Sequence, residues 1–236
     1  MSINTRQDVP TANRILAALP RKEYQSLLPK LTPVTLTFGE ILYERGDTIR
    51  HVYFPNNSVI SLLSTVAERA PLEVGMVGNE GMAGLSVFMG IDKAGTRGLV
   101  KAGGSAFRMK SATLRKISNH ASSLHTILHR YTYSLLTQIS QSSACNRFHT
   151  ADARLARWLL MTSDRRSSNE VRLTQDFLSK LAGIRREAVS KAACALQKEK
   201  LINYSRGVIA ILNRPGLEQV SCGCYAIIRE SDIFGH

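Results

Sequence analysis

A single glycine between two short amphipathic runs constrains this chain more than any other feature of its sequence. Thr174 can cap a first helix over residues 175–182, and a second helix follows from about residue 185 to residue 200. Gly183 lies between the two runs and can adopt the left-handed backbone conformation that a tight turn needs. The apolar positions that would pack the two helices together are Leu178, Ala182, Ile184, Val189 and Ala192. The segment therefore predicts a helix-turn-helix.

The second predicted helix carries polar and charged side chains on one face, because spacings of three and four residues bring side chains to the same side of a helix. These residues are Arg186, Glu187, Ser190 and Lys191. Arginine and lysine suit the acceptors of guanine, and glutamate suits the amino donor of cytosine. We expect this end of the helix to enter the major groove of double-stranded DNA, with Thr174, Gln175 and Arg185 contacting phosphates. The alternative is a solvated charged face on an ordinary helical hairpin.

A short hairpin is predicted directly after this helix. Two β-prone runs within residues 201–212 flank Ser205, Arg206 and Gly207, a sequence typical of a tight turn. A hairpin in this position is a wing, and Arg206 at its tip is expected to contact backbone phosphate.

The charge of the chain favours a polyanionic partner. The chain has 31 lysines and arginines against 18 acidic residues, a net charge of +13. Residues 147–216 alone hold 14 basic and 6 acidic residues. Basic groups displace the counterions that condense around nucleic-acid phosphates. A general basic RNA-binding protein is one alternative, but RNA modules usually offer stacking aromatic side chains, and only 6% of this chain is aromatic.

Residues 31–110 have the pattern of a β-rich domain. Val34, Leu36 and Phe38 alternate with threonines, and short apolar runs recur at 41–43, 51–54, 59–63, 72–76 and 107–109. Glycine- and asparagine-containing turns separate the runs, which indicates a β-sandwich or a β-roll. A short helical segment is expected before it over residues 12–30, and a helix capped by Ser111 after it.

A long helix without glycine or proline is predicted from residue 121 to about Arg147. Apolar residues follow the alternating spacing of a coiled coil, and we expect them to form the interface of a homodimer: Leu124, Leu128, Tyr131 and Leu135. A second apolar stripe, formed by Ile127, Leu136 and Ile139, is expected to pack against the β-rich domain. The alternative is a helix buried wholly within one subunit. A further amphipathic helix is expected over residues 151–163, followed by a loop over 164–170.

Several classes of protein and site are disfavoured. No apolar run approaches the ~18 residues of a membrane span, and residues 1–8 lack a secretory core. We therefore expect a cytoplasmic protein. Four cysteines are too few for a disulfide scaffold. Cys222 and Cys224 are interpreted as two unrelated thiols, because no second closely spaced Cys/His pair accompanies them, and the alternative is half a metal site or a redox pair. His125 and His129, one helical turn apart, are interpreted as surface residues. A metal-dependent enzyme built on a β-roll remains an alternative, but without a nucleophile-elbow or phosphate-loop motif we expect no enzyme and no bound metal.

From about residue 12 to residue 224 the chain resembles the Crp/Fnr superfamily of bacterial transcription regulators. The resemblance is most specific at Leu173–Gln175, Gly183–Val189 and Tyr204–Gly207, and the run from Leu212 to Tyr225 is similar to the tail of one subgroup. It implies an α+β fold with a β-roll sensor domain like that of cyclic-nucleotide-binding proteins (12–118), a dimerisation helix (119–148), a winged helix-turn-helix (149–220) and a C-terminal tail (221–236). It also implies a homodimer on two-fold-symmetric DNA, base reading by Arg186, Glu187 and Lys191, and RNA polymerase as a partner.

The sensor half departs from the pattern of relatives that bind cyclic nucleotides. Those proteins use a Gly-Glu-Leu turn for the ribose and an Arg-Ser/Thr-Ala step for the phosphate, whereas the matching stretches here are Gly84–Ser86 and Ala94–Thr96, with Arg97 after the threonine. A cyclic phosphate needs a paired cation in its pocket. We therefore expect no cyclic nucleotide, and Gly81, Gly84 and Gly90 are expected to make turns. The N-terminal cysteine cluster of oxygen-sensing relatives is also absent, so we expect no iron–sulfur cofactor.

Overall fold

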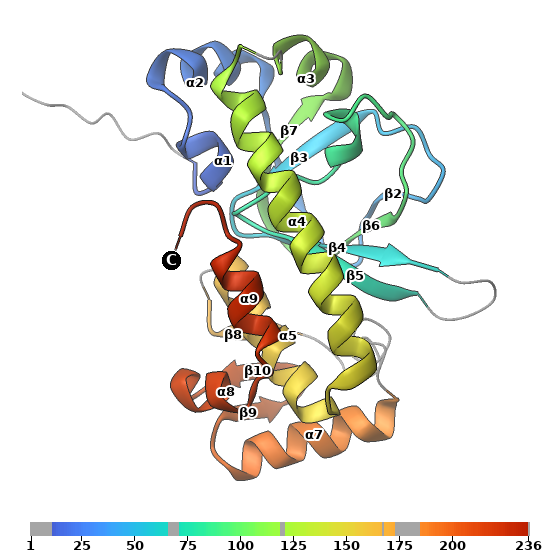
Figure 1. Cartoon of the computed structure of the whole chain (residues 1–236), viewed down its shortest axis with the longest axis vertical. Coiled ribbons are helices and arrows are strands. Elements are labelled where there is room, and N and C mark those ends of the chain that lie inside the picture. Colours follow the sequence, from blue (N-terminus) through green and yellow to red (C-terminus); the bar gives the residue numbers. More distant parts are fainter. Residues whose placement is uncertain (1–10, 66–70, 119–120, 167, 173–184, 236) are drawn as a thin grey trace, which may run out of the picture.

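The computed structural model describes residues 11–65, 71–118, 121–166, 168–172 and 185–235. The molecule is elongated, with a β-rich domain at one end and a smaller helical domain at the other (Figure 1). One long helix, α4 (Ser123–Phe148), runs along both. This is the α+β order that the sequence predicts.

Two antiparallel sheets build the β-rich domain. One has the strand order β1-β7-β3 and the other the order β2-β6-β4-β5. Their bounds are β1 Thr32–Leu36, β2 Ile41–Tyr43, β3 His51–Pro55, β4 Val59–Ser64, β5 Leu72–Val77, β6 Arg97–Ala102 and β7 Gly104–Lys110. Six of the seven follow apolar runs seen in the sequence. The exception is β6, in which two polar or charged residues interrupt the alternation.

The two sheets share one hydrophobic core. On β3, Val52 and Phe54 are fully buried while His51 and Tyr53 are half-buried, as expected of a strand with one face inward. Ile60 of β4, Val100 of β6 and Met109 of β7 contribute from the neighbouring strands. This core gives helix α4 a rigid surface on which to pack.

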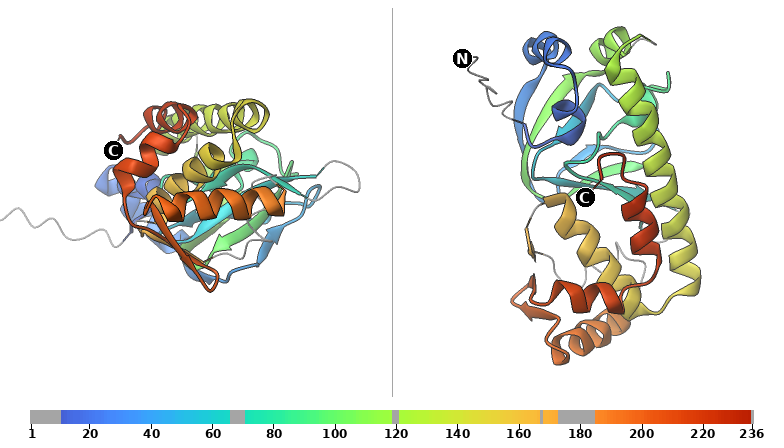
Figure 2. Two further views of the ribbon diagram at one scale, coloured as in Figure 1. Left: turned by 90° about the horizontal axis from the view of Figure 1, so that it is seen from below. Right: turned by 60° about the vertical axis from the view of Figure 1, so that its left-hand side comes forward.

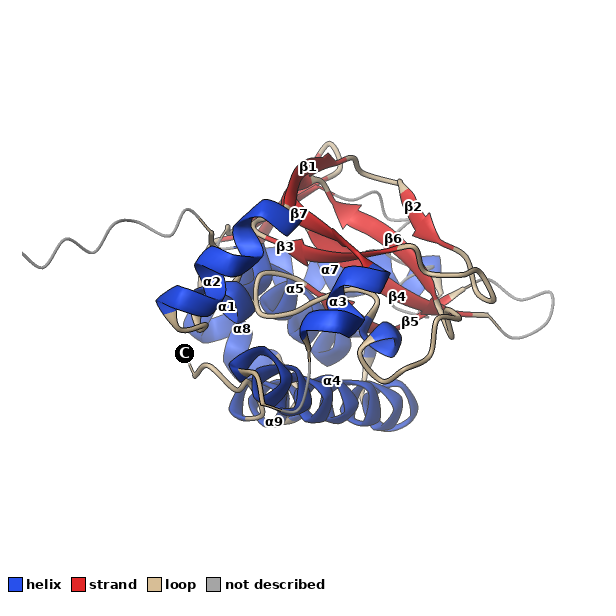
Figure 3. Ribbon diagram, turned by 90° about the horizontal axis from the view of Figure 1, so that it is seen from above, coloured by secondary structure: helices blue, strands red, loops and turns tan. Residues whose placement is uncertain are grey.

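Short helices close the far end of the β-rich domain, as Figure 3 shows from above. They are α1 (Arg14–Ala17), α2 (Arg21–Leu27), the 3-10 turns η1 (Leu28–Lys30) and η2 (Leu85–Val87), and α3 (Ser111–Ile117). The predicted cap of α3 is wrong by one residue. Lys110 occupies the cap position, and the hydroxyl of Ser111 donates a 2.6 Å hydrogen bond to the carbonyl of Ile49.

The predicted interface face of α4 is wrong. Leu124, Leu128, Tyr131 and Leu135 are between 0% and 7% exposed, because they pack into the core of their own β-rich domain. Leu136, expected on the domain side, is 61% exposed. Both stripes are apolar, so the sequence could not tell which one the sheet covers. For this face, the structure agrees with the alternative prediction that the helix is buried within its own subunit.

The helical domain begins with α5 (Ala151–Arg166), which continues three residues into the segment expected to be a loop. A small antiparallel sheet follows, in the order β8-β10-β9. The remaining elements are β8 (Glu170–Arg172), α7 (Arg186–Lys198), β9 (Ile202–Ser205), β10 (Val208–Ile211), α8 (Arg214–Val220) and α9 (Cys224–Glu230). Their core is centred on Trp158 and Leu159 of α5.

The segment expected to be a C-terminal tail is folded. Helix α9 lies beside the lower half of α4, and the chain then turns back toward the N-terminal helices (Figures 1 and 2). Arg14 next to the start of the chain and Asp232 near its end form an ion pair of 2.7 Å. The last residues thus connect the two ends of the sequence.

Candidate nucleic-acid interface

Helix α7 lies across the end of the molecule farthest from α2 and α3 (Figures 1 and 2). Its inner face is made of Val189, Ala192, Ala193 and Leu196, all at most 1% exposed. The three small side chains and the short repeat of three and four residues let the helix sit close against α5. Because the inner face is tightly packed, the rotation of the helix is fixed and its opposite face points to solvent.

The predicted base-reading residues share that outer face. Arg186, Glu187 and Lys191 are exposed, Ser190 is half-buried, and Arg185 is the exposed N-cap residue of the helix. All five lie in the cap and the first two turns, at the positive end of the helix dipole. A helix end of this kind has the shape and hydrogen-bonding groups that the major groove of DNA admits.

A Schellman motif ends α7. The amide of Leu201 donates to the carbonyl of Leu196 (3.0 Å), and the amide of Lys200 donates to Gln197 (2.9 Å). Lys200 has a φ of 58°, the left-handed conformation that glycine usually supplies at this position. The motif turns the chain sharply into β9, which places the hairpin beside the helix.

The predicted wing is confirmed. Val208 pairs with Ser205, so Arg206 and Gly207 alone form the loop between β9 and β10. Both have positive φ, 49° and 78°, as a type I′ turn requires. The turn exposes Arg206 at the tip, and the side-chain oxygen of Gln197 on α7 accepts a 3.0 Å hydrogen bond from the amide of Tyr204. This bond ties the wing to the helix.

The first helix of the predicted motif falls outside the described residues. Thr174, Gln175 and Gly183 lie there, with the packing positions Leu178, Ala182 and Ile184. Of the predicted packing positions, Val189 and Ala192 are described, and both are buried.

Comparison with known protein families identifies this domain. Residues 153–220 match the Crp-like helix-turn-helix domain. About four fifths of the chain has the fold of two solved structures. They are FixK2 from Bradyrhizobium japonicum (TM-score 0.69, 16% identity, 81% of this chain and 98% of that one) and TTHB099, a CRP-family transcriptional regulator from Thermus thermophilus (0.65, 18%, 80% and 96%). A Crp/Fnr-family regulator from Eubacterium rectale matches similarly (0.65, 16%, 88% and 97%). No curated protein sequence matches at a significant level.

Residues 153–220 therefore form a Crp-like helix-turn-helix domain. The chain joins this domain to a β-rich domain and shares its overall fold with solved transcription regulators of the Crp/Fnr family. No helix among the described residues is long and apolar enough to span a membrane.

A buried polar network joins the β-rich domain to the helical domain. Glu73 of β5 accepts hydrogen bonds from Nε1 of Trp158 on α5 (2.8 Å), from Nζ of Lys101 on β6 (3.1 Å) and from the hydroxyl of Ser61 on β4. The Lys101 ammonium also lies 4.2 Å from the centre of the Trp158 ring. Burial lowers the pKa of Lys101 to about 8, although Glu73 opposes the shift.

The same strand also holds α4. The side-chain amide of Gln138 accepts from the backbone amide of Met76 (2.7 Å) and donates to its carbonyl (3.1 Å), as a neighbouring strand would. Strand β5 is therefore hydrogen-bonded to the long helix through Met76 and to helix α5 of the helical domain through Glu73. A shift of this strand would therefore change the hydrogen bonds to both α4 and α5.

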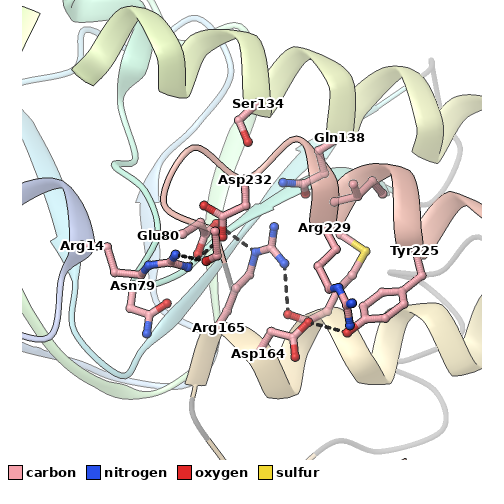
Figure 4. A pocket seen from close by; sticks show the side chains of 13 residues that line it. Arg14, Asn79, Glu80, Ser134, Gln138, Asp164, Arg165, Tyr225, Arg229 and Asp232 are labelled. Carbon is pink, nitrogen blue, oxygen red and sulfur yellow. Dashed lines mark hydrogen bonds and ion pairs between the residues drawn. The ribbon is translucent and has the colours of Figure 1, made fainter. Parts of the chain in front are cut away.

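A charged cavity of about 380 Å³ lies next to this junction. Figure 4 shows the side chains that line it, which come from both ends of the chain and from α4, α5 and α9. Arg165 pairs with Glu80 (2.9 Å) and Tyr225 donates to Asp164 (3.0 Å). Arg14, which also lines the cavity, pairs with Asp232. Arg14 and Arg165 are thus matched by carboxylates from within the cavity wall.

The β-rich domain has a second cavity where cyclic-nucleotide-binding relatives have their ribose and phosphate motifs. It measures about 210 Å³ and lies between Gly84–Ser86, Ala94–Thr96 and the α4 residues Leu135 and Ile139. Its lining is mostly apolar, and Arg97 next to it pairs with Glu44 at 2.7 Å. Gly84 and Gly90 have positive φ and make turns. Gly81 closes a turn too, since its amide donates to the carbonyl of Gly78 (3.1 Å), and it lies against the ring of Tyr131.

The expectation that Cys222 and Cys224 are unrelated thiols is wrong. The end of α4 brings Cys145 and His149 to them, and the ligand atoms of all four residues lie within 4.8 Å of one another. The second Cys/His pair was present in the sequence at helical spacing, four residues apart, but 77 residues separate Cys145 from Cys222. By contrast, His125 and His129 make edge-to-face contacts with the ring of Phe88, with centroids 5.3 and 5.2 Å away.

Proposed function

We propose that this regulator binds a two-fold-symmetric DNA site as a homodimer and reads it with helix α7 in the major groove. The observation that carries the proposal is the position of α7, whose cap and first two turns expose Arg185, Arg186, Glu187 and Lys191 at the free end of the molecule. The wing presents Arg206 beside it. In this role the exposed residues in the first two turns of α7 read base edges. Phosphates are contacted by Arg206 on the wing and by Thr174, Gln175 and Arg185.

The exposed face of α4 supports the homodimer. His129, Tyr133, Leu136, Ser140, Ser143 and Arg147 are all exposed and follow the alternating spacing of four and three residues. This is the spacing of a two-helix seam, and small residues in its second half allow close approach. Tyr133 and Leu136 are 66% and 61% exposed, which makes them the large side chains that a partner helix would cover.

We further propose that a cyclic nucleotide is not the effector. A ribose needs an acceptor and a cyclic phosphate a cation, whereas the cavity at Gly84–Ser86 and Ala94–Thr96 is lined mainly by carbon atoms. The guanidinium of Arg97 is engaged by Glu44. A regulator of this kind would act without catalysis, in the cytoplasm, and contact RNA polymerase at the promoter.

Selection of bound sites from random double-stranded DNA tests the proposal. The purified protein should enrich an inverted repeat whose half-sites lie one helical turn apart, about 10 base pairs centre to centre. Addition of cyclic AMP or cyclic GMP should leave the enrichment unchanged. Enrichment of no sequence, or stronger competition by structured RNA than by duplex DNA, would refute the assignment.

A further inference from the structure

Three thiols and one imidazole from distant parts of the chain meet beside the junction of α4 and α5. Cys145 and His149 lie one helical turn apart at the end of α4, where His149 is the residue that caps the helix. Cys222 precedes α9 and Cys224 is its first residue. The sulfur atoms of Cys145 and Cys222 are 3.4 Å apart, and the sulfur of Cys224 is 3.6 Å from Nδ1 of His149.

We propose that Cys145, His149, Cys222 and Cys224 bind a single Zn²⁺ ion that fastens helix α9 to the end of helix α4. Three cysteines and one histidine are a common ligand set of structural zinc, and Zn–S bonds of about 2.3 Å in a tetrahedron place the sulfur atoms about 3.8 Å apart. The four ligand atoms lie within 4.8 Å of one another. The widest separation exceeds the tetrahedral value by no more than about 1 Å, so small side-chain rotations would close a tetrahedral site.

The size of the cage favours one ion over a cluster. An iron–sulfur cluster places several iron and sulfide atoms between its ligands, so its four protein ligands must stand farther apart than a single ion requires. The burial of the ligands also suits a single ion. The three cysteines are at most 8% exposed, while His149 is exposed and leaves one side of the site open for an ion to enter.

Two arginines of α5 supply positive charge at this place. Three thiolates, one neutral imidazole and Zn²⁺ together carry one negative charge, which is costly to bury alone. Arg154 and Arg157 lie close enough to interact electrostatically with the thiols. Nη2 of Arg154 donates to the side-chain oxygen of Asn146 on α4 (2.9 Å), which holds this arginine against the same end of the long helix.

Zinc bound here would join two parts of the chain that are far apart in sequence. The ion would tie the connection between α8 and α9 to the last turn of α4, directly before the chain enters the DNA-binding domain at α5. Helix α9 is already held at its other end by the pair of Arg14 and Asp232. With the metal, both ends of α9 are fixed, and its removal is expected to free the end nearer the DNA-binding domain.

Metal analysis of the full chain tests this inference independently of DNA binding. The reduced protein, incubated with zinc chloride and freed of excess metal, should retain one Zn²⁺ per chain. Co²⁺ in its place should give the visible absorption of a tetrahedral site and the near-ultraviolet bands of thiolate ligation. Zinc binding should weaken at least about tenfold in each ligand variant, namely Cys145→Ser, Cys222→Ser, Cys224→Ser and His149→Ala.

The matched controls should retain the ion. They are Cys194→Ser, at an exposed cysteine of α7, and His129→Ala, at an exposed histidine of α4.

Thermal unfolding provides a second measurement. A ligand that binds only the folded state raises the midpoint, so a strong chelator should lower the melting temperature of the wild type and leave that of His149→Ala unchanged. His149 is exposed, so this variant should fold. The proposal fails if the wild type retains no stoichiometric zinc, if the ligand variants bind it as well as the controls, if an iron–sulfur chromophore is present, or if Cys145 and Cys222 form a disulfide while zinc is supplied.

Discussion

Nε1 of Trp158 lies 2.8 Å from Oε1 of Glu73 and donates a hydrogen bond to it. The tryptophan belongs to α5, against which α7 packs, and the glutamate belongs to strand β5 of the β-rich domain. Both side chains are buried. The bond is therefore a direct polar link between the β-rich domain and the helical domain.

Trp158→Phe keeps an aromatic ring in the core but removes the donor. We expect it to lower the free energy of unfolding by about 1–3 kcal/mol, because Glu73 loses one of its donors in a buried place. The measurement is urea unfolding followed by circular dichroism, since Trp158 is the only tryptophan of the chain. Tyr133→Phe, at a position that is 66% exposed, is the control and should cost little. Equal losses for the two variants would show that the link to Glu73 contributes nothing specific.

Lys101 gives the network a dependence on pH. Burial lowers its pKa to about 8 in the folded chain, against an ordinary value of 10.5. Between these two values the unfolded chain binds more protons than the folded one, so this group makes stability rise with pH. The cost of burying the charge is fully present below pH 8 and is relieved as the pH approaches 10.5. We expect the stability of the wild type to increase over this window relative to Lys101→Met, measured by urea unfolding at several pH values. A difference that stays flat would mean that Lys101 keeps its proton throughout.

Base reading is assigned to Arg186. Replacing it with alanine should cost about 1–3 kcal/mol at the selected site and relax the base preference at one position of each half-site. Lys198→Ala removes an equal charge from the last turn of the same helix, at an exposed position farther from the groove. It should leave the preference intact. Fluorescence anisotropy on the selected site and its single-base variants measures both, and an unchanged preference in Arg186→Ala would remove this residue from base reading.

A different effect is expected at Arg206, whose left-handed φ of 49° complicates a change to alanine. Asparagine tolerates that conformation and is favoured before glycine in a type I′ turn, so Arg206→Asn removes the charge and keeps the wing. Affinity should fall about equally on specific and random DNA, and the slope of log K against log salt should shrink by about one. Arg206→Lys should restore the slope. If Arg206→Asn instead alters base preference, the wing reads sequence and our assignment of Arg206 is wrong.

Local patterns of the sequence predicted most of the fold. Alternation and short apolar runs between turn residues located six strands of the β-rich domain, and the absence of glycine and proline located α4. Ser205, Arg206 and Gly207 between two β-prone runs predicted the wing, because its turn depends on residues adjacent in the chain. The exposed residues at the start of α7 were found in the same way, from spacing within one helix.

Relations between distant residues could not be predicted. The two apolar stripes of α4 are equivalent as sequence, and only the sheet decides that it covers Leu128. The basic surplus is also misleading in part, since Arg165 and Arg214 are used in ion pairs with Glu80 and Asp164 inside the molecule. The Cys/His cluster was missed because its two halves are joined only when α9 folds back along α4.

The corrected face of α4 yields the last prediction. Leu136→Asp places a charge on the exposed seam, where it would be buried against a second subunit, and should therefore produce folded monomers. Leu128→Asp places the same charge in the core of the chain's own β-rich domain, where Leu128 is fully buried, and should unfold that domain instead. Sedimentation velocity together with circular dichroism separates the two outcomes. A Leu136→Asp protein that sediments as the wild type does would place the subunit interface away from this face, whereas a folded, monomeric Leu128→Asp protein would show that the buried face is the one shared between subunits.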